Sequence, residues 1–303
     1  MTDTAPRRAH SLKEMAEIQG RIFSPEAIGA GIAAWRPEPT DVVISPSGKC
    51  GTTWLQQTFH ALRTRGDMDF DDISRVVPWI ETSAALGLDI NAPQRGQPRG
   101  FKSHLGWAQV PKGAKYVVSL RDPRDALVSM HRFMEGWFLE PGAVSIEDFA
   151  QNWLRQSPEQ GYFAHLIGWF EQRANPAVLL FSYEAMSAEP ERHIRRLAQF
   201  CDIALDDTLL ALTLEHSSLP FMLAHKDRFV DAMLRKLSEQ VCNLPPGSDS
   251  AKVRRGAVGS HRDELPAAIA EALDARWREV VTPKLGFESY ADLQATLASP
   301  DAA

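Results

Sequence analysis

The stretch of chain from residue 41 to residue 66 constrains the fold more than any other. Residues 41–44 are a short, β-branched apolar run, which predicts a buried strand. The strand leads through a glycine-containing loop, residues 48–54, into a segment with apolar residues every three or four positions before Gly66. That spacing predicts a helix ending near the glycine. A strand that passes through such a loop into a helix is the repeating unit of a parallel sheet.

The same pattern occurs twice more. Residues 115–120 predict a strand, followed by a helix that Asp122 caps and that runs toward Gly136. Residues 177–182 predict a third strand, followed by a helix at 189–200, and residues 267–277 predict a C-terminal helix. We therefore expect an α/β, three-layer, P-loop-like fold with a central parallel sheet flanked by helices. Its ligand site should lie at the carboxyl ends of the strands.

One domain, residues 41–290, accounts for these units. Residues 1–40 are polar and rich in proline and predict a partly ordered lead-in, and residues 291–303 form a C-terminal tail. Residues 241–253 contain two prolines and a glycine and predict a mobile loop, whose role as a lid is left open.

Composition excludes several classes of protein. A net charge of −6 argues against a protein that coats nucleic acid. The three cysteines, Cys50, Cys201 and Cys242, form neither a disulfide scaffold nor a zinc signature. No apolar run approaches the roughly 18 residues of a membrane-spanning helix, and the N-terminus lacks the apolar core of a secretion signal. We expect a cytoplasmic protein with no nucleic-acid partner and no stable membrane insertion.

The loop at residues 48–54 has the composition of a phosphate site. Its glycines let a ligand approach the backbone N–H groups at the start of a helix, Lys49 adds a positive charge, and Thr52 and Thr53 add hydroxyl groups. It is not a Walker A loop, because Cys50 stands where Ser or Thr would hold Mg²⁺. Trp54 either stacks on a purine or belongs to the core.

Three further segments carry candidate site residues. Arg121 ends a predicted strand and Ser129 lies about two helical turns later, so both can face the same sheet edge as the loop. Arg254 and Arg255 precede Gly256 in a basic turn suited to phosphate. Residues 101–105 include Lys102 and His104, which project to one face if the backbone is extended.

These segments together resemble a known family. Lys-Cys-Gly-Thr-Thr-Trp is similar to the 5′-phosphosulfate-binding loop of the cytosolic-type sulfotransferases, Pro-Lys-Ser-Gly-Thr-Thr-Trp, which use 3′-phosphoadenosine 5′-phosphosulfate (PAPS). Residues 116–129, the Arg-Arg-Gly turn and Lys-Ser-His-Leu also resemble family segments. The likeness covers roughly residues 40 to 290. It departs at Gly48 and Cys50, at Leu219, and after Gly259, where Ser-His-Arg replaces Asp-Trp-Lys.

The resemblance implies roles for individual residues. His104 is the general base, and Lys49 and Lys102 assist catalysis. The residues implied to bind PAPS are Lys49, Cys50, Gly51, Thr52, Thr53, Trp54, Arg121, Ser129, Tyr183, Leu219, Met222, Arg254, Arg255 and Gly256. The short dimerisation motif of some animal members is not evident, so homodimer formation is left open.

The reaction implied is in-line transfer of a sulfuryl group from PAPS to a hydroxyl or amine, which releases 3′-phosphoadenosine 5′-phosphate (PAP) and requires no metal. Segments that border the acceptor pocket in related proteins here carry Trp79, Trp107, Phe133, Trp137 and Phe138, so a small apolar or aromatic acceptor is expected. Two alternatives stand beside this hypothesis. One is a P-loop kinase or NTPase, and the other is a catalytically inactive nucleotide-binding module.

Overall fold

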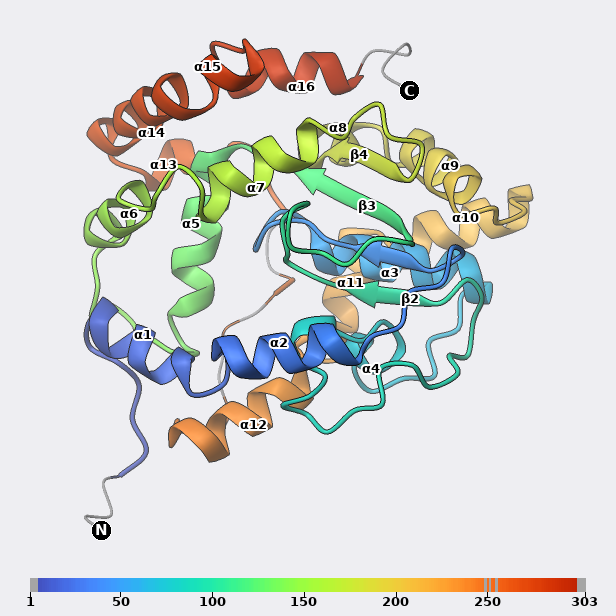
Figure 1. Ribbon diagram of the computed structural model, residues 1–303, viewed down its shortest axis with the longest axis horizontal. Coiled ribbons are helices and arrows are strands. Elements are labelled where there is room, and N and C mark those ends of the chain that lie inside the picture. The colour runs from blue at the N-terminus through green and yellow to red at the C-terminus, as the bar shows by residue number, and fades with distance from the viewer. Residues whose placement is uncertain (1–4, 248–249, 251, 254–255, 299–303) are drawn as a thin grey trace.

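A computed structural model describes residues 5–247, 250, 252–253 and 256–298. Four parallel strands form a sheet in the order β2-β1-β3-β4, and helices flank it on both sides (Figure 1). The predicted α/β class with a central parallel sheet is therefore confirmed. The strands are β1 (Val42–Ile44), β2 (Gly100–Lys102), β3 (Lys115–Leu120) and β4 (Val178–Ser182).

The sheet separates two hydrophobic cores, because side chains alternate between the faces of a strand. In β1, Val42 and Ile44 pack into one core and Val43 into the other. In β3, Val117 joins the first core, whereas Val118 joins the second. The three layers therefore follow from β-branched strands that are buried on both faces.

Helices that supply the first core follow β1 and β4 in the sequence. α3 begins directly after the glycine loop, so its N-terminus lies at the carboxyl end of β1. The elements on this side are α3 (Thr52–Thr64), α4 (Ile73–Val76), α8 (Tyr183–Ala188), α9 (Pro190–Phe200), α10 (Asp207–His216), α11 (Leu219–Ala224) and the 3₁₀ turn η2 (Lys226–Phe229).

Helices that supply the second core come from both ends of the chain and from its middle. They are α1 (Leu12–Gly20), α5 (Pro123–Met134), α6 (Ile146–Leu154), α7 (Gly161–Phe170), α12 (Ala232–Cys242), α14 (Ala267–Val280) and α16 (Tyr290–Ala298). The remaining elements are α2 (Pro25–Ala34), the 3₁₀ turn η1 (Ile80–Thr82), α13 (His261–Glu264) and α15 (Thr282–Leu285).

The chain termini contribute helices to the packed structure. Within the segment expected to be a partly ordered lead-in, the Ser11 and Ser24 hydroxyls cap α1 and α2, and Met15 and Ile18 are buried. In the segment expected to be a tail, Leu293 of α16 is fully buried. α12 extends to Cys242 and so includes the start of the loop expected at residues 241–253. Among the described residues, no helix is both long and apolar enough to cross a membrane.

Candidate active site

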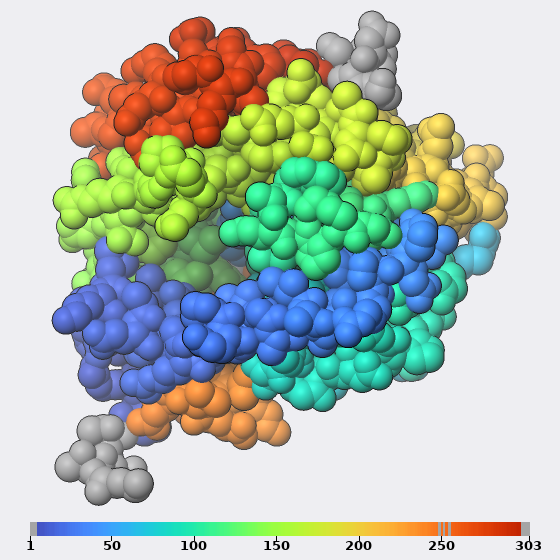
Figure 2. All heavy atoms as spheres, viewed as in Figure 1, coloured from blue at the N-terminus to red at the C-terminus, as the bar shows by residue number. Residues whose placement is uncertain are grey.

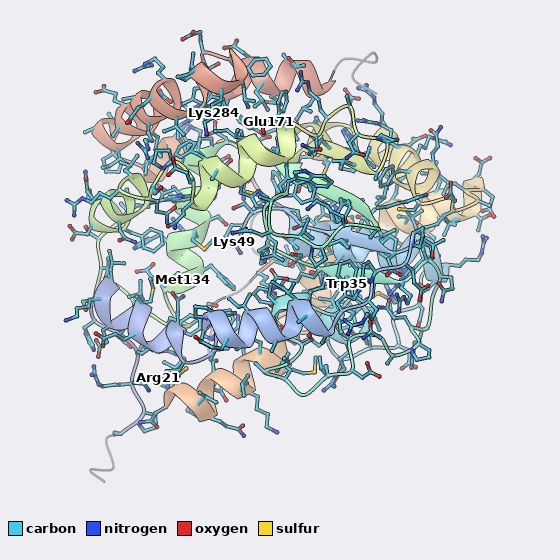
Figure 3. All side chains as sticks on the ribbon, viewed as in Figure 1. Arg21, Trp35, Lys49, Met134, Glu171 and Lys284 are labelled. Carbon is cyan, nitrogen blue, oxygen red and sulfur yellow. The ribbon has the colours of Figure 1, made fainter. Side chains whose placement is uncertain are left out.

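A cavity of about 680 Å³ lies at the carboxyl ends of the strands. On the surface the molecule is hollowed between the N-terminal helices and the green segments around α5 and α7 (Figure 2), and residues of both regions line the cavity. In Figure 3, Lys49 lies beside α5, and Met134 lies at the end of that helix. The cavity brings together these residues singled out in the sequence: Lys49, Gly51, Thr52, Thr53, Trp54, Lys102, His104, Arg121, Ser129, Tyr183, Leu219, Met222 and Gly256.

Among the described residues expected to bind the donor, Cys50 does not line the cavity. The Cys50 side chain is buried, with 1% exposure, and its backbone N–H donates to the Ser47 carbonyl at 3.1 Å. Burial raises the pKa of the Cys50 thiol to about 12, so the thiol stays protonated and packs in the core. Arg254 and Arg255 lie outside the described residues.

The loop before α3 includes two residues with a left-handed backbone. Lys49 and Gly51 have positive φ angles of 65° and 96°, and a Cβ at position 51 would lie 2.9 Å from the Tyr183 ring. Only glycine combines this φ with so close a contact. The Thr52 hydroxyl is buried without a hydrogen-bond partner among the described residues. A buried unpartnered hydroxyl at the N-terminus of a helix fits an anionic ligand.

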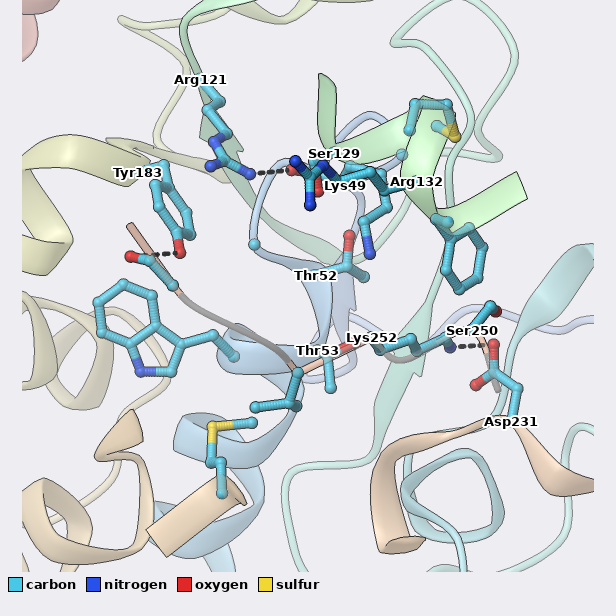
Figure 4. A pocket seen from close by; sticks show the side chains of 18 of the residues that line it. Lys49, Thr52, Thr53, Arg121, Ser129, Arg132, Tyr183, Asp231, Ser250 and Lys252 are labelled. Carbon is cyan, nitrogen blue, oxygen red and sulfur yellow. Dashed lines mark hydrogen bonds and ion pairs between the residues drawn. The ribbon is translucent and has the colours of Figure 1, made fainter. Parts of the chain in front are cut away.

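Arg121 connects this loop to the segment that follows Gly256. Its guanidinium donates to the Lys49 carbonyl at 2.9 Å and to the Ala257 carbonyl at 3.2 Å, and it lies 4.3 Å from the centre of the Tyr183 ring. The Tyr183 hydroxyl donates to the Gly256 carbonyl at 3.3 Å (Figure 4). Two segments that are distant in the sequence are thereby held at one side of the cavity.

Asp125 anchors the same segment from α5. Its carboxylate accepts hydrogen bonds from the backbone N–H groups of Gly259 and His261, at 2.7 and 2.9 Å, and from the His261 ring at 2.8 Å. Burial alone would raise the pKa of Asp125, but these hydrogen bonds lower it below its usual value. Asp125 thus holds the chain after Gly256 against α5. The hydrogen bonds of the Arg121 guanidinium go instead to the Lys49 and Ala257 carbonyls.

His104 is held in one tautomer. Its Nδ1 lies 2.7 Å from the Pro46 carbonyl oxygen, which can only accept, so Nδ1 carries the proton and Nε2 carries the lone pair. The His104 backbone N–H donates to Glu81 at 2.7 Å. Burial and the charge of Lys102 lower the pKa of His104 to about 3, so the ring is neutral near pH 7. A neutral imidazole with an open Nε2 can accept a proton.

A second group of charges, which sequence reasoning missed in part, lies near His104. The Lys102 Nζ is 2.9 Å from the Asp231 carboxylate and 3.8 Å from the centre of the Trp79 ring. Lys252 forms an ion pair with the same carboxylate. Lys252 precedes the Arg-Arg-Gly turn by two residues, so the basic run could have pointed to it, whereas no sequence signal marks Asp231.

The other half of the cavity is apolar. Its walls are Phe23, Trp79, Met130, Phe133, Met134, Trp137, Phe138 and Pro141. Trp107, expected among them, instead packs against Tyr116 and Trp169, with ring centres 5.5 Å apart in each case. No cluster of three or more His, Cys, Asp or Glu side chains that could hold a metal ion occurs in the described part of the chain.

Several characterised proteins are similar in sequence along most of the chain. Sulfotransferase 2A1 of Macaca fascicularis is 28% identical over 251 residues, which cover 80% of this chain and 84% of that protein. The 3-alpha-hydroxysteroid sulfotransferase of Cavia porcellus is 26% identical and covers 87% and 92%, respectively. Sulfotransferase 1C2 of Homo sapiens is 22% identical and covers 88% and 92%.

Solved structures share the fold. Retinol dehydratase, in complex with androsterone and inactive cofactor PAP, superimposes with a TM-score of 0.69 and 18% identity, covering 92% of this chain and 96% of that one. Mouse sulfotransferase SULT7A1, complexed with PAP, gives a TM-score of 0.67 and 20% identity, covering 91% and 94%. Because the sequence model of the sulfotransferase domain matches residues 39–285, this chain belongs to the sulfotransferase domain family.

Proposed function

We propose that this protein transfers a sulfuryl group from PAPS to a hydroxyl or amine of a small apolar or aromatic acceptor, with His104 as the general base. The observation that carries the proposal is the neutral imidazole, with Nδ1 held on Pro46 and Nε2 unprotonated. His104 lines a cavity that has a cationic half and an apolar half. A base in this cavity can take the proton from an acceptor while the donor is bound in the same cavity.

The cationic half fits a nucleotide with two anionic ends. Lys49, the N-terminus of α3 and the unpartnered Thr52 hydroxyl suit the 5′ end. Arg121 and Ser129 suit the 3′-phosphate, and the family resemblance assigns Arg254 and Arg255 to the same group. Trp54 and Tyr183, whose ring centres are 5.7 Å apart, suit the adenine. The family resemblance and the PAP complexes of the two solved neighbours support this choice of donor.

The chemistry divides among few side chains. Bound PAPS would supply a sulfuryl group that is already activated by its phosphate leaving group. His104 accepts the acceptor proton at Nε2, because Nδ1 is committed to Pro46. Lys49 and Lys102 stabilise the negative charge that grows on the leaving oxygen, and the burial of Lys102 strengthens its effect.

The apolar half suits the acceptor. Aromatic and methionine side chains form most of this wall, and such walls favour ligands with a flat or aliphatic body. Androsterone occupies one retinol dehydratase complex and retinol another, and both molecules have that character. These are properties of the neighbour, and they support the acceptor class proposed here.

The two alternatives make different predictions. A P-loop kinase or NTPase needs a hydroxyl after the loop lysine, but the chain has Cys50 there, with its side chain turned into the core. Binding of Mg-ATP should therefore be much weaker than binding of PAP in a direct titration. An inactive nucleotide-binding module would bind PAP normally and transfer nothing.

The deciding experiment is a transfer assay with ³⁵S-labelled PAPS over a panel of phenols, steroid alcohols, other alcohols and amines. The H104A variant should lose about 10²- to 10⁴-fold in kcat, the usual contribution of a general base, while PAP binding and the circular dichroism spectrum stay unchanged. H10A, which removes an exposed histidine, is the matched control. Near-normal turnover by H104A would remove the proposed base, and no transfer by the wild type would favour the inactive module.

A further inference from the structure

The Asp231 carboxylate is shared by two lysines at the cavity wall. One oxygen, Oδ2, lies 2.9 Å from the Lys102 Nζ and also pairs with Lys252. The other, Oδ1, accepts from the Ser74 hydroxyl at 2.5 Å. The side chains of Lys102, Lys252 and Asp231 are 3%, 8% and 3% exposed, and Figure 4 shows the Lys252 side chain directed toward Asp231. Side chains from three separate segments thus converge on one buried carboxylate.

The backbone at Asp231 is adapted to this arrangement. Asp231 stands at the N-cap position of α12 but has a left-handed φ of 54° and makes no capping hydrogen bond. Asp72 instead accepts from the Ala232 N–H at the start of that helix. An aspartate at an N-cap normally caps its helix, and a left-handed conformation is unfavourable for a non-glycine residue. The side chain has therefore been turned from its helix toward the two lysines.

Charge balance explains why the carboxylate is needed. Burial would raise the pKa of Asp231, but the charges of Lys102 and Lys252 hold it far below its usual value. Burial lowers the pKa of Lys252 to about 7, with Asp231 opposing that shift and Lys102 adding to it. Asp72, on α4, is the other carboxylate near this group. Without Asp231, two buried positive charges would repel each other with little compensation.

We propose that Lys252 is a further cation for the sulfuryl-transfer centre and that Asp231 is the residue that positions Lys252 and Lys102 there. The proposal rests on the proposed function. Both lysines line the same cavity as Lys49 and His104. As the acceptor oxygen or nitrogen bonds to sulfur and the bridging S–O bond breaks, the electron pair goes to the leaving phosphate oxygen and the acceptor proton goes to His104. Lys252 keeps its proton and stabilises that charge by a hydrogen bond.

A pH dependence follows from this arrangement. The groups that face Lys252 are Lys102 from β2, Asp231 from the start of α12, Asp72 from α4, and His104. Because Lys252 acts in its charged form, kcat/KM, which reports the pKa values of the free enzyme, should fall as pH rises through about 7, by about tenfold per pH unit. His104 is neutral throughout this range, so its titration does not contribute to the pH dependence of the rate. Removing Asp231 should move the fall to lower pH by about one to three units, the usual effect of losing a close opposite charge.

Four variants test the proposal by kcat and kcat/KM across about pH 4 to 9. K252M should lose about 100-fold in kcat below pH 7, as when one charge-stabilising donor is removed. K252R keeps a charge that does not titrate in this range, so it should remain active and lose the alkaline fall. D231N should show the fall at lower pH. D202N is the matched control, because Asp202 also has a left-handed φ of 56° and pairs with a lysine, at 2.5 Å, but is 82% exposed.

A second measurement needs no donor. Competitive acetylation of the nucleotide-free protein, followed by mass spectrometry, should give Lys252 a titration near pH 7 in the wild type and in D202N, and a lower one in D231N. If D231N does not fold, the wild-type labelling and K252R still decide the question. Activity of K252M equal to wild type, or an unchanged Lys252 titration in folded D231N, would overturn the inference. Complete inactivity of the wild type would instead count against the proposed function.

Discussion

Acid should destabilise this protein through its buried neutral histidines, and His165 offers the cleanest test. His165 is 7% exposed, and its Nε2 lies 3.0 Å from the Ser45 carbonyl, one residue before the carbonyl that orients His104. Burial lowers the pKa of His165 from 6.5 to about 4. Between about pH 4 and pH 6.5, the imidazole is therefore protonated in the unfolded chain but neutral in the folded protein.

The magnitude follows from the pKa difference. Stability from a histidine with a lowered pKa is fully present above its unfolded value and is lost as pH falls. At about pH 5 the unfolded imidazole is protonated and the folded one is not, so the loss is about 1.5 pH units at 1.36 kcal/mol each, or about 2 kcal/mol. That is a large part of the 5–15 kcal/mol typical of folded proteins.

Urea unfolding followed by tryptophan fluorescence, at about pH 7 and about pH 5, measures this loss. H165Q places an amide N–H where Nε2 stood, so it keeps a donor for Ser45 but does not titrate. Its stability should therefore fall by about 2 kcal/mol less than that of the wild type over the same interval. H10Q, at an exposed site, should behave as the wild type does. Carboxylates and the other buried histidines change the stability of all three proteins by the same amount, so their contribution cancels when the proteins are compared. The reasoning fails if H165Q and the wild type lose the same stability between these two pH values.

Two further predictions concern the loop and Arg121. R121K should weaken PAP binding by about tenfold or more, because lysine cannot bond both the Lys49 and Ala257 carbonyls and also reach a phosphate. Calorimetric titrations measure this loss of affinity, which should be small for adenosine 5′-phosphate because it has no 3′-phosphate. An equal loss of affinity for both nucleotides would contradict a 3′-phosphate role for Arg121. G51A should destabilise the protein by more than the roughly 1–2 kcal/mol of a left-handed alanine, because its Cβ would lie 2.9 Å from the Tyr183 ring. G87A has a φ of 64° with nothing within 4 Å and isolates the backbone cost; equal melting temperatures for the two variants would refute the contact argument.

Local sequence determined the α/β framework. The short apolar runs at β1, β3 and β4 predict strands because burial on both faces favours such runs, and helical spacing predicts α3, α5, α9 and α14. Once strands and helices alternate, chain handedness and the parallel sheet bring Arg121 and the loop at residues 48–54 to one edge. The chemistry of the loop was also local, since glycine, lysine and hydroxyl groups lie within six residues.

Tertiary packing alone decided where individual side chains point. Asp231 and Lys102 are 129 positions apart, so no local pattern could join them. Cys50 faces the core. Trp107 packs against Tyr116 and Trp169, whereas Trp79 lines the cavity. Backbone preferences depend on a few neighbouring residues, but burial, charge pairing and the tautomer of His104 depend on groups that only the folded chain brings together.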